Sequence, residues 1–525
     1  MDTIWIVLLT VMAILGAPLF TIFGAAAMLL FLALPDTSIT GTANDVFSEK
    51  FADSPLLVTI PLFTFAGYLM AESGTPQRLV KVSRAWLGWM PGGLAMVCLV
   101  ASAFFTTFTG GSGITIVAIG GLLFPALLSD KYNENFSLGL VTTGGSLGLL
   151  FPPSIPMILY GVVAGVMIEK IFLAGMIPGI IVVAALGVYS AIIGVKQKMP
   201  RTPFAWKEAF SSFWEAKWEA ALPVGLLGGM YSGLLRIHEA AAFTAIYVLI
   251  IEVWVYRDVS FRRDLPRIIR EAMTLVGAIL IILSTAIGFT AFLIQARVPM
   301  LILESMEALI STQLMFLVAL NFFLIGVGML MDIFSAIVVV VPLIVPIALS
   351  FGVDPYHLGI IFLLNLEIGY LTPPVGLNLF IASFRFNKPI TQLYRSVLPF
   401  IGLLVICLIL VTYIPVLSTW LPSLIEDQGI SLDAPGGDED VEGFDLDALE
   451  EGGDEFDLDD LEEDDDDWDP SEDDDEWAGD DDDDDWDPAA DDDVWEERTP
   501  KDAGKEPDSG AAEAEEKPEP DEGSP

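Results

Sequence analysis

The stretch GGSLGLLFPPSIPMILYG at residues 144–161 decides the fold, and NLEIGYLTPPVGLNLFIAS at residues 365–383 repeats its pattern. Each stretch contains one pair of adjacent prolines, Pro152-Pro153 in the first and Pro373-Pro374 in the second. A proline removes a backbone donor and clashes with the preceding turn, so we expect each helix to unwind at its pair. Unwinding frees carbonyl oxygens for a small hard cation, while the half-helix that follows presents its positive end to an anion.

Composition places the chain in a bilayer. Of its 525 residues 53% are hydrophobic and the mean hydropathy is +0.60, which is too apolar for a soluble enzyme. Only two cysteines and two histidines occur, which excludes a disulfide framework and a histidine metal cluster. No Walker loop or GxSxG elbow is present, so nothing indicates an enzyme or nucleotide-driven transport, and coupling to an ion gradient is the natural alternative.

Sliding the chain against itself by 221 positions aligns the residues that break helices. The aligned positions are Gly67 with Gly288, Pro125 with Pro346, Gly148 with Gly369, and the two proline pairs. Stretches 91–128 and 313–350 are too long for one span, and each predicts a re-entrant helical hairpin with a flexible or polar tip. Asp332 lies at the second tip, where it is either a site residue or a helix cap, and Glu367 before the second break has a site or a structural role.

Basic segments predict the orientation of the chain in the membrane. Four of them are read as cytoplasmic loops, around residues 78–84, 196–217, 257–270 and 385–395. Segment 54–74 then runs inward and its partner 273–296 outward, so the two halves are inverted repeats. Residues 1–34 are read as a retained span, and the same count of spans leaves the C-terminal tail on the periplasmic side.

These patterns divide the chain into a membrane transport domain and a tail. The membrane domain covers residues 1–425, with repeat one at about 1–196, a connecting amphipathic helix at about 203–220 and repeat two at about 221–421. Of the 71 acidic residues 49 follow position 425, against 4 of the 25 basic ones, so residues 426–525 predict a disordered acidic tail. The tail is either a solvating polyelectrolyte or a set of Phe, Leu and Trp anchors for a basic partner or divalent cations.

Several long motifs in order resemble the large membrane subunit of the tripartite ATP-independent periplasmic (TRAP) transporters. They are GSLGLLFPPSIPMILYG, PVGLLGGMYSGLL followed by HEAAAF, GMLMDIFSAIVVVVPLIVPIA, and NLEIGYLTPPVGLNLF. The resemblance implies an all-α, elevator-type, sodium-coupled importer of small organic acids such as dicarboxylates in the bacterial inner membrane. Its implied partners are a small four-helix membrane subunit and a periplasmic substrate-binding protein, with no nucleic acid. The chain departs from the family at 235–238, where Leu-Arg-Ile-His replaces a Thr-Pro-Thr-like stretch.

The resemblance also implies site residues, carried over by motif. The first sodium site would use Gly110, Ser112 and Gly113 at the first tip with Gly145 and Pro152 at the first break. The second would use Gly328, Asp332 and Ser335 at the second tip with Gly369, Thr372, Pro373 and Gly376 at the second break. The substrate would lie near Ser154 and Asn378, and sodium is the only metal or cofactor expected.

Two other functions fit the same sequence. One is a stand-alone symporter of divalent anions and sodium with a similar repeat architecture. The other is a membrane scaffold that recruits partners through its acidic tail. Neighbouring genes for a small four-helix subunit and a binding protein would argue against the first alternative. Loss of sodium-dependent uptake in an Asp332→Ala protein that still folds and assembles would exclude the second.

Overall fold

A computed structural model describes residues 17–31, 55–295 and 312–427, with a few single positions before and between them. Within these ranges every regular element is a helix, which confirms the all-α prediction. Seven single helices there are long and apolar enough to cross a bilayer, or up to nine spans if two bent pairs are added. The acidic tail beyond Asp427 lies outside the described residues, so its disorder stays a prediction.

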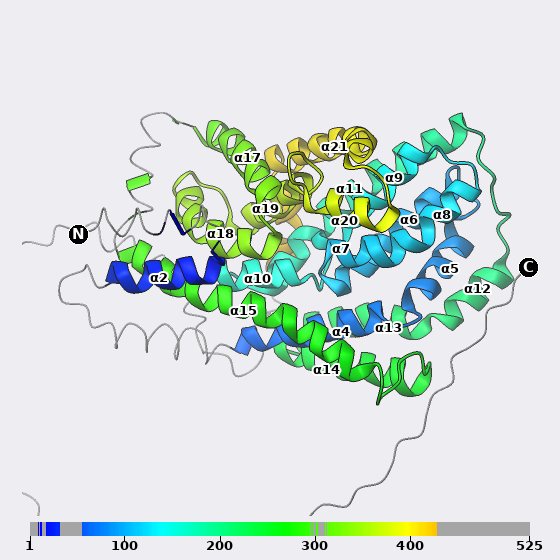
Figure 1. Ribbon diagram of the computed structural model, residues 1–525, viewed down its shortest axis with the longest axis horizontal. Coiled ribbons are helices and arrows are strands. Elements are labelled where there is room, and N and C mark those ends of the chain that lie inside the picture. The colour runs from blue at the N-terminus through cyan, green and yellow to red at the C-terminus, as the bar shows by residue number, and fades with distance from the viewer. Residues whose placement is uncertain are drawn as a thin grey trace, which may run out of the picture. The chain divides into compact units, whose positions relative to one another are not determined.

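One group of helices, here called the frame, lies along one side of the view in Figure 1. It comprises α2 (Leu19–Phe31), α4 (Thr59–Ala71), α5 (Thr75–Leu87), α12 (Trp206–Glu215), α13 (Lys217–Tyr231), α14 (Ile237–Ile250) and α15 (Leu265–Gln295). The long helix α15 packs against α2 and α4, and α14 packs on α4. A short 3₁₀ turn at Pro55–Val58 precedes α4, and a π-helical turn at Ile251–Val255 extends α14.

The remaining helices form a second group, here called the core, which contains most of the largest buried side chains. Its first half comprises α6 (Gly93–Thr109), α7 (Ser112–Thr115), α8 (Gly121–Ser129), α9 (Glu134–Gly144), α10 (Ile155–Ala164) and α11 (Ile168–Lys196). Its second half comprises α17 (Gln313–Leu330), α18 (Ile333–Ser350), α19 (Pro355–Gly369), α20 (Leu377–Phe386), α21 (Ile390–Tyr413) and α22 (Val416–Asp427).

Both predicted hairpins and both predicted breaks are present. Helix α6 turns at Gly110-Gly111 into α7 and α8, and α17 turns at Met331-Asp332 into α18. The breaks are wider than predicted, because helix α9 already ends at Gly144 and α19 at Gly369, several residues before their prolines. A 3₁₀ turn at Leu147–Leu150 fills part of the first break, and the peptide bonds within both proline pairs are cis.

Two observations support the repeat. Helices α4 and α15 pack along each other, and Glu72 at the end of α4 pairs with Arg267 at the start of α15 at 2.7 Å. The two helices therefore run in opposite directions, as inverted partners must. In the core, α10 of the first half packs on α18 of the second, and α20 of the second half packs on α7 of the first. The two halves thus exchange equivalent contacts.

The connecting helix differs from its prediction. Residues 203–220 were expected to form one amphipathic helix, but α12 ends at Glu215 and α13 begins at Lys217. A contact distant in sequence holds this bend, because the Tyr256 hydroxyl donates to the Glu215 carbonyl at 2.6 Å. Helix α12 buries only Ala209 and Ser212 and exposes its tryptophans and phenylalanines.

Candidate functional site

The first tip and the first break meet. Gly110 ends α6 with φ +62°, a left-handed conformation that favours glycine, and Ile155 at the start of α10 packs against it. The Thr106 hydroxyl donates to the Gly145 carbonyl at 2.9 Å, and a Cβ on Gly145 would lie 3.0 Å from the Ser112 carbonyl oxygen. A backbone oxygen of the tip therefore lies beside the break. Gly113 follows on α7, and Pro152 is buried within the break.

The second tip and break make a comparable contact. A Cβ on Gly369 would lie 2.6 Å from the Cα of Gly328, so the hairpin and the broken helix touch backbone to backbone. Gly376, with φ +54°, donates its N–H to the Met329 carbonyl at 3.4 Å. A Cβ on Gly376 would also lie 3.0 Å from each of two carbonyl oxygens, those of Tyr370 and Thr372. This break, which includes Pro373, thus directs several carbonyl oxygens to one place.

Asp332 is the N-cap of α18, as one of its two predicted roles required. Its carboxylate accepts the N–H groups of Phe334 and Ser335 at 3.1 Å each and the Ser335 hydroxyl at 2.5 Å. The side chain is exposed at the tip, whereas Ser335 is buried. Thr372, in contrast, turns its hydroxyl to the Ile368 carbonyl at 2.7 Å.

The two predicted substrate residues are buried polar groups with unused hydrogen-bonding atoms. Asn378 at the start of α20 accepts the Ser112 hydroxyl at 2.7 Å, which joins the second half to the first tip. Its amide Nδ2 has no partner in the described part of the chain, and neither does the Ser154 hydroxyl. Both residues are fully buried. Ser154 adjoins Ile155, which packs on the first tip, so both side chains lie near that tip.

A second hydrogen bond crosses between the halves. The Ser146 hydroxyl in the first break donates to Oε1 of Glu367 in α19 at 3.3 Å, and both residues are fully buried. Oε2 of Glu367 has no partner among the residues that the structure describes. An unpaired buried polar atom costs free energy.

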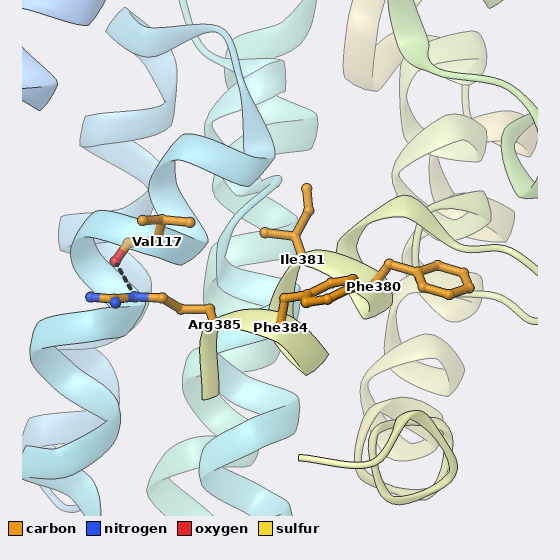
Figure 2. Close-up of a pocket in the computed structure, with 5 residues that line it drawn as sticks. All are labelled: Val117, Phe380, Ile381, Phe384 and Arg385. Atoms are coloured by element: carbon orange, nitrogen blue, oxygen red, sulfur yellow. Dashed lines mark hydrogen bonds between the residues drawn. The ribbon is translucent and has the colours of Figure 1, made fainter. Parts of the chain in front are cut away.

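A cavity of about 670 Å³ lies between the frame and the core. Frame residues near the end of α4 and the start of α5 form one wall; the α7–α8 segment and α20 form the other. Gly113 and Ile381, neighbours of the Ser112–Asn378 contact, line it, and so does Arg385. Figure 2 shows Arg385 reaching to Val117, whose carbonyl accepts from Nε at 3.0 Å. Val117 lies in a π-helical turn, Ile116–Gly120, between α7 and α8.

Arg385 brings an uncompensated charge to this cavity. The other charged lining residue is Glu72, which is paired with Arg267. Arg385 has no carboxylate partner in the described ranges, and a guanidinium presents five N–H donors, of which Nε uses one. The cavity therefore suits an anion.

Residues 6–417 match the family model described as the tripartite ATP-independent periplasmic transporter, DctM component. The chain belongs to this family. The C4-dicarboxylate TRAP transporter large permease protein DctM of Vibrio cholerae is 34% identical over 434 residues, 79% of this chain and 96% of that protein. The isethionate TRAP transporter permease protein DctMQ of Oleidesulfovibrio alaskensis is 36% identical over 404 residues, 77% of this chain and 63% of that protein.

A solved structure supports the fold of this DctM-family chain. The crystal structure of the Alcanivorax borkumensis YdaH transporter, whose title reports an unusual topology, aligns with a TM-score of 0.53 at 14% identity. The alignment covers 78% of this chain and 98% of that one. Family and apolar helices together make the protein a multi-pass protein of the inner membrane, and its relatives are named as transporter permeases, not as enzymes.

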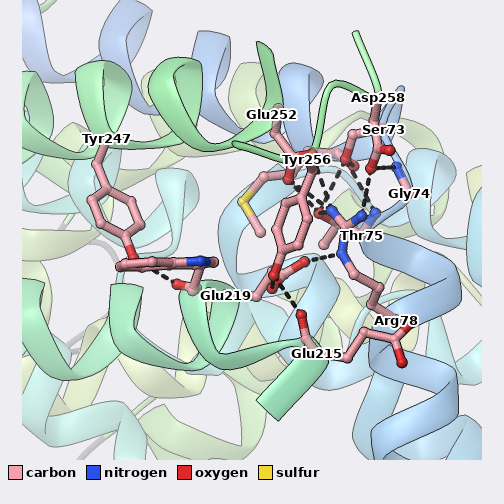
Figure 3. A network of polar contacts seen from close by, with 12 residues as sticks. Ser73, Gly74, Thr75, Arg78, Glu215, Glu219, Tyr247, Glu252, Tyr256 and Asp258 are labelled. Carbon is pink, nitrogen blue, oxygen red and sulfur yellow. Dashed lines mark hydrogen bonds and ion pairs between the residues drawn. The ribbon is translucent and has the colours of Figure 1, made fainter. Parts of the chain in front are cut away.

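The frame of this permease contains a charged network that anchors one wall of the cavity. Arg78 on α5 pairs with Glu219, Glu252 and Asp258, as Figure 3 shows, and its guanidinium stacks on the Tyr256 ring at 3.7 Å. Burial raises the pKa of the Tyr256 hydroxyl, and a hydrogen bond to the Glu219 carboxylate raises it further, so this hydroxyl stays a donor. The network ties α5 to α13 and to the end of α14.

In the sequence, Arg78 and Arg385 stand out only as basic residues that set the orientation, and Ser146 only as part of the motif around the first break. A signal for Arg385 was available, because it lies seven residues after Asn378, on the same face of one helix. No local signal marks Ser146 as a partner of Glu367, apart from the repeat offset itself. The sodium and substrate roles of the other residues stay predictions.

Proposed function

We propose that the protein is the membrane subunit of a sodium-coupled secondary importer of small organic acids. The observation that carries this proposal is the meeting of each tip with its own break, with the Ser112 carbonyl oxygen beside Gly145 and the Tyr370 and Thr372 carbonyl oxygens beside Gly376. Unwound carbonyls at paired broken helices are the ligands that transporters use for sodium. The first site would use Gly110, Ser112, Gly113, Gly145 and Pro152; the second would use Gly328, Asp332, Ser335, Gly369, Thr372, Pro373 and Gly376.

The substrate would bind beside the first tip. Asn378 Nδ2 and the Ser154 hydroxyl are buried donors that lack a partner in the described ranges, and a carboxylate oxygen would satisfy them. Arg385 would attract the anion into the cavity. Two relatives are named for small organic anions, one for C4-dicarboxylates and one for isethionate. Their names favour the same substrate class here.

Two partners follow from the family. A periplasmic binding protein would deliver the substrate, and a small permease subunit would complete the membrane assembly. Transport that proceeds without a binding protein would instead favour the stand-alone symporter.

The test is uptake by proteoliposomes that contain this chain, its small subunit and its binding protein. A thermal-shift screen of the binding protein with C4-dicarboxylates, isethionate and related acids first selects the radiolabelled substrate. We expect uptake under an inward sodium gradient and none under an inward potassium gradient of equal size. Equal uptake under both gradients would overturn sodium coupling, and a binding protein that responds only to uncharged ligands would overturn the substrate class.

A further inference from the structure

The Ser146–Glu367 hydrogen bond joins two equivalent positions of the repeat. The two residues are 221 positions apart, the same offset that aligns Gly148 with Gly369 and one proline pair with the other. In an object with two-fold symmetry, two equivalent points are separated by twice their distance from the axis. Equivalent residues therefore touch only when they lie next to the axis. The bond therefore lies at the pseudo-two-fold axis between the halves, where the two broken helices meet.

Each end of this bond is attached to the hairpin of its own half. On one side, the carbonyl of Gly145, the residue before Ser146, accepts the Thr106 hydroxyl, and the Thr107 hydroxyl donates to the Gly148 carbonyl at 3.3 Å. On the other side, Gly369, two residues after Glu367, packs on Gly328 of α17.

These hairpin contacts are themselves equivalent. Thr107 and Gly328 are again 221 positions apart, and they touch Gly148 and Gly369, which share that offset. A continuous line of contacts therefore runs from the first hairpin, through Ser146 and Glu367, to the second hairpin. The bond lies one residue from Gly145 in the first proposed ion site and two residues from Gly369 in the second.

A carboxyl group at this place needs a functional explanation. Glu367 is fully buried, its Oε2 has no partner in the described part of the chain, and leucine would fill the space without an unpaired oxygen. Ionisable residues inside membrane helices are costly and usually functional.

We propose that Glu367 is a positioning residue that couples the two ion sites through its hydrogen bond to Ser146. This inference rests on the sodium coupling proposed above. An ion bound at the first site fixes Gly145 and therefore Ser146; the bond then fixes Glu367 and the start of the second break, which prepares the second site. Coupling between sites is reciprocal, so binding at the second site prepares the first in the same way.

The experiment measures sodium binding without substrate, by thermal stability of the purified assembly with its small subunit in detergent. Sodium chloride replaces choline chloride at constant ionic strength. In the parent protein we expect stabilisation with a Hill coefficient of about 2, the limit for two strongly coupled sites. Ser146→Ala and Glu367→Leu should lower the coefficient to about 1 while sodium still stabilises the protein.

Two variants separate the hydrogen bond from other effects. Glu367→Gln keeps an acceptor oxygen for Ser146, so it should keep the parental coefficient. Ser190→Ala removes another buried serine hydroxyl that has no partner among the described residues, and it should also match the parent. Should Glu367→Leu fail to assemble, Ser146→Ala and Glu367→Gln decide the outcome.

The possible failures are distinguishable. A parent protein that does not respond to sodium overturns the proposed function, and the coupling with it. The coupling alone is overturned if the parent responds to sodium with a Hill coefficient of 1. It is also overturned if the Ser146→Ala variant has the same Hill coefficient as the parent. A Glu367→Gln variant with a coefficient of 1 overturns the role of the hydrogen bond.

Discussion

The charged network of the frame and the proposed sites of the core pair their buried polar side chains in opposite ways. In the frame, Arg78 pairs with three carboxylates, and the buried acids Glu219 and Glu252 both contact it. In the core, Ser154, Asn378 and Glu367 each retain a buried polar atom that has no partner in the described ranges. A saturated network holds helices in fixed positions, whereas an unpaired buried donor or acceptor is available to a ligand. The difference favours a frame that stays fixed and a core that binds the ligand.

The largest expected effect is the loss of Arg78. Arg78→Met leaves buried carboxylates without their cation, which costs about 3–5 kcal/mol. Equilibrium unfolding in SDS–detergent mixed micelles measures the loss. Arg267→Met is the matched control, because Arg267 forms ion pairs whose side chains are all about 40% exposed, and its loss should change stability little. Equal destabilisation by both variants would contradict the role assigned to the buried network.

The second effect concerns the one carboxylate at a tip. Asp332 and Asp354 are both N-caps, of α18 and α19, so replacing either by alanine should cost about 1 kcal/mol of stability. Only Asp332→Ala should weaken sodium activation of transport, by about tenfold or more, which corresponds to ~1.4 kcal/mol. Sodium titration of uptake measures this. If Asp354→Ala weakens activation as much, capping alone explains Asp332.

How far the sequence predicts the molecule depends on the range of the interaction. Prolines and glycines act on their own backbone, so both hairpins and both breaks were predictable. The bend between α12 and α13 was not, because Tyr256 lies 41 residues from Glu215. The Ser112–Asn378 bond joins residues 266 positions apart, and only packing of α20 on the first tip creates it.

Arg385 should have a smaller effect, confined to charged substrates. Arg385→Gln removes a positive charge of the cavity that has no carboxylate partner among the described residues. It should raise KM for an anionic substrate several-fold, because an exposed charge contributes about 0.5–1 kcal/mol to binding. Salt should reduce the difference between parent and variant, because it screens exposed charges. Arg395→Gln is the control, an exposed arginine ten residues further along the chain. A loss of transport that is independent of salt would instead indicate that the bond to Val117 matters for folding.

The smallest effect on stability is expected at Ser154, and a small effect there would separate a role in transport from a role in folding. The hydroxyl has no hydrogen-bond partner among the described residues, so Ser154→Ala removes a desolvated donor and should leave stability within about 0.5 kcal/mol of the parent, or raise it. Substrate uptake should nevertheless fall, since the hydroxyl would contact the carboxylate. Unfolding in mixed micelles and uptake, measured on the same preparation, give both values. A core residue that is dispensable for folding but needed for transport is the reverse of Arg78. Normal transport by the Ser154→Ala protein would show that the substrate does not bind at this hydroxyl.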